Sequence, residues 1–238
     1  MPLRSIPLAC LVLIPGLARQ VAAAASDPPS NTLFVDCDEQ EKPKHLLSPV
    51  SLSDDKKWRA YVEVDVRTDL GCLHTTRLWI ARTDESYRLA YLMPPKRTAA
   101  GNGMAILGWR VHSNMLLVRT EQWQYGSDAP DVQQVLAVDA STGLIYEPEL
   151  EAMLQAHEGK ECSFRVTGAG FSAYGGILVR AQLSTVIEPG DTEEDIPPAK
   201  RCENEEGTWS FNFDTGEIRR VANTTVLQLY RPTQPDGQ

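Results

Sequence analysis

The feature that most constrains this chain is a pattern that recurs along it. Its three copies, each a polar turn that leads into an apolar strand, are residues 54–63, 112–121 and 173–182. The equivalent positions Ala60, Leu117 and Leu178 lie about 60 residues apart, which is long for a repeat of one supersecondary unit. The pattern predicts that one sheet module was copied along the chain and that its apolar side chains stack against those of its neighbours.

Alternation of apolar and polar residues indicates how each strand is buried. In the first copy, residues 58–67 alternate strictly, as in a strand buried on one face. The strands of the other copies, 116–118 and 177–179, are continuous apolar runs that indicate cover on both faces. Each copy then offers two more strands around a turn that contains an aspartate, and these lie at 78–81 and 87–92, 135–138 and 144–146, and 209–213 and 217–221.

These strands predict an all-β fold of antiparallel, propeller-like repeats in a single domain over residues 26–231. The repeats span about 46–95, 103–148 and 163–221, and 32–35 and 226–230 are candidate closing strands. Residues 148–159 predict a short amphipathic helix, because proline and acids begin the segment and glycine ends it. An acidic, proline-rich exposed loop is expected at 188–206, and a disordered tail at 232–238.

The three copies carry a family resemblance, which is weakest in the third. Residues 48–62 (SPVSLSDDKKWRAYV) resemble the SPDGKW signature of the WD40-like β-propeller repeats of TolB and the dipeptidyl-peptidase propellers. Residues 108–118 are similar, with Trp109 where that family has its tryptophan, whereas 171–177 has an extra residue and no aspartate. The resemblance implies a propeller-like fold and no active site. Closed propellers have at least four blades, so three repeats require a fourth blade from the termini, a partner chain or an open twisted sheet. A twisted β-sandwich is the alternative fold.

The first 25 residues are expected to be a secretory signal peptide. Arg4 supplies a positive start, residues 6–17 form an apolar stretch interrupted by two prolines, and 22–25 are alanines that suit a signal peptidase. The apolar stretch is shorter than the roughly 20 residues that span a bilayer. We therefore expect cleavage near Ala25, an extracytoplasmic location in the periplasm or medium, and no membrane span.

The charge of the chain argues against one class of partner. Its formal net charge is −9, and loss of the two arginines of the leader makes the remainder more acidic. An acidic surface repels phosphate backbones, and no basic cluster with interleaved aromatic residues offsets it. We expect no nucleic-acid partner.

The cysteines predict disulfides. Four follow the expected signal peptide, an even number that favours disulfides in an oxidising compartment, and they are Cys37, Cys72, Cys162 and Cys202. Pairing within repeats joins Cys37 to Cys72 and Cys162 to Cys202, although four cysteines allow three pairings. A structural zinc site is the competing interpretation, but no C-x-x-C pair is present and His157 with Cys162 is isolated. We expect no metal and no cofactor.

Three short motifs suggest active or binding sites but are better explained otherwise. Residues 170–176 have one residue too many for a G-x-S-x-G elbow, and every histidine precedes Ser172. Residues 213–216 match an aspartic-protease core, but that chemistry needs two aspartates and Asp214 has no second copy. Residues 191–195 lack the spacing of a calcium loop. We expect two turns and a solvated acidic loop, and no catalytic residue.

The tryptophans are expected to differ in role. Four fall in or beside the repeating strands and are expected in the core: Trp58, Trp79, Trp109 and Trp209. The fifth, Trp123, lies with Tyr125 just before the turn residues 126–130, so both are candidate contacts with a partner at a hairpin tip.

These observations predict a secreted or periplasmic, non-catalytic binding or scaffold protein whose partner is a protein or a glycan. The alternative is a hydrolase whose site is assembled from residues far apart in sequence. A homodimer is a further hypothesis, because two chains of three blades could close a ring of six.

Overall fold

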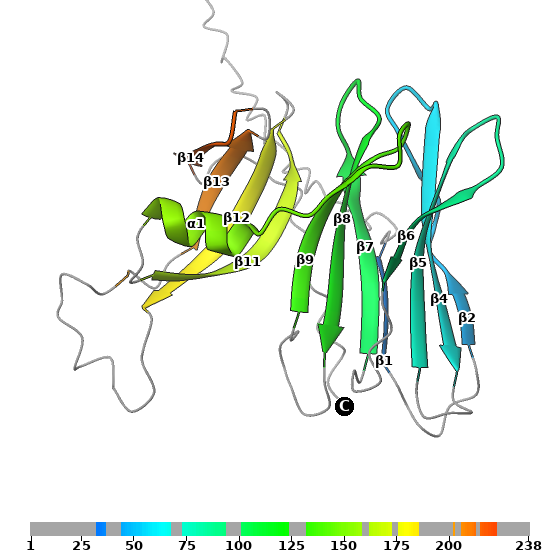
Figure 1. The fold of residues 1–238 in the computed structure, drawn as a ribbon, viewed down its shortest axis with the longest axis horizontal. Helices are drawn as coiled ribbons and strands as arrows, with labels where there is room; N and C mark the ends of the chain where they lie inside the picture. Colours follow the sequence, from blue (N-terminus) through cyan, green and yellow to red (C-terminus); the bar gives the residue numbers. More distant parts are fainter. Residues whose placement is uncertain are drawn as a thin grey trace, which may run out of the picture.

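Three antiparallel sheets stack face to face in this protein (Figure 1). The computed structural model describes residues 32–36, 44–67, 73–93, 101–123, 132–158, 162–172, 176–185, 202, 206–212 and 215–222. Within these residues the fold is all-β with a single short helix, which confirms the predicted fold class. No helix in these segments is long and apolar enough to cross a membrane.

Each sheet is a meander of neighbouring strands. The first sheet holds β2 (Lys44–Leu47), β3 (Ser51–Leu52), β4 (Trp58–Arg67), β5 (Leu73–Arg82) and β6 (Arg88–Met93). The second holds β7 (Gly101–Trp109), β8 (Met115–Trp123), β9 (Val132–Asp139) and β10 (Ile145–Tyr146), with β1 (Thr32–Asp36) added beside β7. The third holds β11 (Cys162–Phe171), β12 (Ile177–Thr185), β13 (Glu206–Asn212) and β14 (Glu217–Val221).

The equivalent positions of the repeated sequence pattern fall on strands of three separate meanders. Ala60, Leu117 and Leu178 lie in β4, β8 and β12, and each of these strands follows the first strand of its meander. The strands predicted after them correspond to β5 and β6, β9 and β10, and β13 and β14. The opening strands β2, β3, β7 and β11 were not predicted. The candidate strand at 32–35 is β1, whereas the one at 226–230 lies outside the described residues.

Two hydrophobic cores hold the three sheets together. The first lies between the first and second sheets and includes Val62, Leu78 and Leu116. The second lies between the second and third sheets and includes Leu117 and Trp209. Consecutive residues of β8 thus enter opposite cores, which is why its apolar run is continuous.

The predicted helix is α1 (Leu150–Glu158), which connects the second sheet to the third. Leu150 and Leu154 are buried in the second core. The predicted turn at Asp139 is also present, since its carboxylate accepts hydrogen bonds from the backbone N–H of Ser141 at 2.8 Å and of Thr142 at 3.2 Å. This local bonding lets the chain reverse between β9 and β10.

One disulfide lies within the described residues and joins Cys162 to Cys202 inside the third repeat, as the within-repeat pairing predicted. Cys37 and Cys72 lie outside the described residues. So do the expected signal peptide, the tail at 232–238, most of the 188–206 loop and Asp214.

Candidate functional site

One face of the first sheet turns away from the rest of the protein. In β4, Ala60, Val62 and Val64 enter the first core, so Tyr61 and the acidic residues that follow it at alternate positions point outward. We call this surface the outward face. Strand register places on it Leu47, Leu52, Arg59, Tyr61, Trp79, Leu89 and Leu92, together with His45, Glu63, Asp65 and Arg77.

The expected core position of Trp79 was wrong. Leu78 and Ile80 on either side of it are fully buried in the first core, and alternation along β5 therefore turns Trp79 to the outward face. Trp58, Trp109 and Trp209 do pack in or against the cores.

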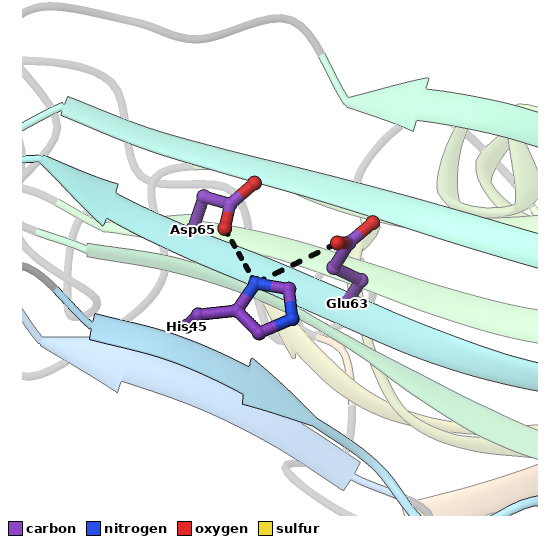
Figure 2. Close-up of side chains that lie close together, drawn as sticks. All are labelled: His45, Glu63 and Asp65. Atoms are coloured by element: carbon purple, nitrogen blue, oxygen red, sulfur yellow. Dashed lines mark hydrogen bonds and ion pairs between the residues drawn. The ribbon is translucent and has the colours of Figure 1, made fainter.

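A cluster of one histidine and two carboxylates lies on the outward face (Figure 2). His45 on β2 is directly opposite Asp65 on β4, and its Nδ1 lies 2.7 Å from Oδ1 of Asp65. The same Nδ1 lies 3.6 Å from Oε1 of Glu63. The three potential ligand atoms are all within 4.8 Å of one another. We call these three residues the His45 cluster.

Two donors on β5 hold the far side of the His45 cluster. Arg77 Nη1 donates a hydrogen bond to Oδ2 of Asp65 and lies 3.7 Å from Oε2 of Glu63. Trp79 Nε1 donates a hydrogen bond to the same Oε2. Each carboxylate therefore has one oxygen engaged by β5, while its other oxygen faces His45.

The charges of the His45 cluster support one another. The hydrogen bond to Asp65 raises the pKa of His45. Desolvation alone would raise the pKa of Asp65, but hydrogen bonds from His45 and Arg77 outweigh it and lower that pKa. At neutral pH Asp65 is therefore an anion between two donors.

A surface depression of about 390 Å³ adjoins the cluster. Its lining includes His45, Asp65 and Arg77, with Lys44, Val66, Arg67, Leu73 and Thr75 around them. It contains no serine or cysteine, and no such side chain bonds His45 within the described residues. The groups that converge here suit ion and hydrogen-bond recognition, and they lack the nucleophile of a Ser–His or Cys–His pair.

Aromatic residues extend the outward face beyond the cluster. The rings of Tyr61 and Trp79 stack with centroids 6.5 Å apart, and Tyr87 meets Tyr61 edge to face at 4.7 Å. The guanidinium of Arg59 lies 4.4 Å from the centroid of the Tyr87 ring. Because these rings are held by one another and by a cation, they lose little conformational entropy when they contact a ligand.

Another ion pair, unlike the His45 cluster, is buried inside the protein. Arg119 Nη2 is 3.0 Å from Oε1 of Glu121 on β8, and both residues are buried. Desolvation raises the pKa of Glu121, although Arg119 and Arg165 oppose it. The Arg119 guanidinium also lies 5.5 Å from the ring of Phe34, which links β1 to β8. The side chains of this pair are only 3% and 12% exposed, so the pair offers little surface to a ligand.

Among the described residues, those singled out in the sequence do not converge on one site. Ser172 accepts a hydrogen bond from the N–H of Gly176 at 3.0 Å, as in the predicted turn. His157 is exposed on α1, and Cys162 is joined to Cys202. Trp123 is the last residue of β8, but its side chain lies outside the described residues, as does Tyr125.

Sequence reasoning missed the His45 cluster because the strand that carries His45 has little pattern and because His45 lies far from the other two residues in the sequence. His45 belongs to a four-residue strand without a strong pattern, and it precedes Glu63 by 18 positions. The available signal was the polar face of β4, on which Glu63 and Asp65 alternate with buried valines.

The fold and site define a class: a disulfide-bonded all-β protein of three stacked meanders with a histidine–carboxylate cluster on an outer sheet. Comparison with known proteins finds no family model, curated protein or solved structure that the chain matches.

Proposed function

We propose that this protein is an extracytoplasmic, non-catalytic binding protein that docks a β-sheet of a protein partner against its outward face. The signal-like start of the chain and the Cys162–Cys202 disulfide support an oxidising compartment. The WD40-like repeat resemblance supports a module that binds rather than catalyses.

The observation that carries this proposal is the exposure of apolar side chains on the outward face. Leu47, Leu52, Leu89 and Leu92 are each between 45% and 56% exposed. They surround the Tyr61–Trp79 pair on the same face. Large apolar residues gathered around aromatic and charged groups are typical of protein interaction surfaces.

The form of the partner follows from how this chain buries its own sheets. The first sheet packs face to face on the second, and the second packs on the third. On the outward face, every second side chain of the strands projects toward solvent, as the side chains on the inner face project into the first core. A further sheet packed there would continue the stack and bury the four leucines.

The partner in this proposal is a different chain, and the two end sheets do not suit a closed ring of two copies. A ring of two copies needs a free outer face on both end sheets. On the third sheet, Leu178 points away from the second core, yet it is only 5% exposed, and Thr208 on the same side is 1% exposed. The two end sheets therefore offer unequal surfaces.

The hydrolase alternative has one observation in its favour, the hydrogen bond between His45 and Asp65. A hydrolase that uses this pair needs a nucleophile beside the histidine or a bound metal. No serine or cysteine side chain lies beside His45 within the described residues, and docking accounts for the exposed leucines, which hydrolysis at this pair does not explain.

Site-specific photo-crosslinking in the native compartment tests the docking proposal. A photoreactive residue in place of Leu47 or Leu89 is expected to give one discrete adduct with another protein. Mass spectrometry identifies that protein, and its fold is expected to be rich in β-sheet. Matched positions outside the face are Val111 and Tyr146, which are 47% and 48% exposed and are expected to give no such adduct. Leu89→Lys in the Leu47 crosslinking background is expected to abolish the adduct.

Three results would contradict the proposal: no adduct from the face, equal adducts from the control positions, or an adduct that consists of two copies of this chain. Binding to a glycan alone, with no protein adduct, would equally reject it.

A further inference from the structure

We propose that the His45 cluster binds one zinc ion through Nδ1 of His45, Oε1 of Glu63 and Oδ1 of Asp65. Imidazole nitrogen and carboxylate oxygen are both zinc ligands in proteins, and three protein ligands leave a fourth position for water. This inference rests on the geometry of the cluster alone and does not depend on the docking proposal.

The two distances from Nδ1 of His45 to the carboxylate oxygens are close to those of a zinc site. Bonds of about 2.0–2.2 Å in a tetrahedral site place neighbouring ligand atoms about 3.3–3.5 Å apart. Nδ1 of His45 is 3.6 Å from Oε1 of Glu63. Its distance of 2.7 Å from Oδ1 of Asp65 is a hydrogen bond that must lengthen by less than an ångström. The side chain of His45 is 57% exposed and therefore has room to make this adjustment.

The carboxylates are already oriented by groups that a metal ion would leave in place. Arg77 and Trp79 engage Oδ2 of Asp65 and Oε2 of Glu63, which are the oxygens that the proposed site does not use. Outer hydrogen bonds of this kind fix ligand orientation and strengthen metal sites. The cluster thus has both a set of ligands and a support behind it.

Charge also decides how tightly the site binds. Two carboxylates carry two negative charges, and Arg77 cancels one of them, so a divalent cation still meets net negative charge. Arg77 also repels a cation at this distance. Replacing Arg77 with a neutral donor is therefore expected to tighten zinc binding, whereas a purely structural ion cluster has no zinc affinity to change.

Calorimetric titration of the full chain with zinc chloride tests the proposal, with any affinity tag removed and cysteines kept oxidised. The wild type is expected to bind one zinc ion in a saturable step. His45→Ala, Glu63→Gln and Asp65→Asn are each expected to weaken binding by at least about tenfold. Arg77→Gln is expected to tighten it several-fold.

The matched control is His157→Ala, because His157 on α1 also lies near a carboxylate, 3.8 Å from Glu158, but no second acidic ligand joins it in the part of the chain that the structure describes. It is expected to bind zinc as the wild type does. Far-UV circular dichroism of each variant verifies that the sheets remain folded. Absence of saturable binding in the wild type, or unchanged affinity in folded His45→Ala, would overturn the proposal.

Discussion

A single carboxylate organises the turn that opens the repeated strand of the first sheet. Asp55 accepts hydrogen bonds from the hydroxyl of Ser53 at 2.8 Å and from the backbone N–H of Lys57 at 3.1 Å, and the ammonium of Lys57 lies 3.0 Å away. Lys56 between them has a φ of 56°. Local bonds of this kind let a non-glycine residue adopt a left-handed conformation.

These contacts predict a pH dependence of folding. Hydrogen bonds from Lys57 and Ser53 lower the pKa of Asp55 from 3.8 to about 2. Because the folded-state pKa lies below the unfolded one, the contribution is complete above pH 3.8 and is lost as the pH falls through about 2. Urea denaturation from pH 4.5 to 2 is expected to show a shallower loss of stability in Asp55→Asn than in the wild type.

The neighbouring residue supplies the control for this experiment. Asp54 takes part in none of these hydrogen bonds, and Asp54→Asn is expected to keep the slope of the wild type. Identical slopes in wild type and Asp55→Asn would show that the turn contacts do not persist in solution.

At the scale of elements, α1 is attached to the third sheet at both ends. Near its start, Oε1 of Glu151 accepts a hydrogen bond from the N–H of Val166 at 2.9 Å. At its end, Oε1 of Glu158 accepts one from Nε1 of Trp209 at 2.7 Å. Between them Leu154 is fully buried in the second core. The helix is therefore packed against the third sheet and contributes to the second core.

Leu154→Ala is expected to destabilise the protein by about 2–5 kcal/mol, because it removes apolar contacts and leaves a cavity that a packed sheet cannot refill. Equilibrium denaturation measures the effect. On the same helix, exposed Ala156→Ser is expected to cost no more than about 0.5 kcal/mol, from helix propensity alone. A loss in Leu154→Ala as small as in Ala156→Ser would mean that α1 is not packed in the second core.

At the scale of the whole molecule, the three sheets form a stack with unequal ends. The outward face of the first sheet exposes four leucines, whereas Leu178 on the far side of the third sheet is buried. A closed ring of two copies would need both ends free. The homodimer predicted from blade number remains a prediction, and this asymmetry weighs against it.

The oxidised chain is accordingly expected to be a monomer in solution, as measured by size-exclusion chromatography with light scattering. Leu89→Lys is expected to leave this mass unchanged, because the outward face is free in the isolated chain. A stable dimer that Leu89→Lys dissociates would instead identify the outward face as a contact between copies.

Much of this architecture was predictable from local patterns. Alternation in residues 58–67 predicted β4 and the face that it buries, and the continuous run 116–118 predicted a strand covered on both sides. The opening strand β7 was not predicted, because Gly101 and Gly103 give it little strand character. A Cβ on Gly103 would clash with the backbone oxygen of Leu33, so the glycine is explained by the approach of β1, a distant segment.

The sequence by itself determined the repeated strands, their turns and the helix, because these depend on side-chain periodicity and hydrogen bonds between residues close in the chain. Only the tertiary structure decided that Trp79 lies outside the core and that His45 meets Glu63 and Asp65. Contacts of this kind depend on strand register and on which face of a sheet is covered. Both are set by packing between distant segments, and no local pattern records them.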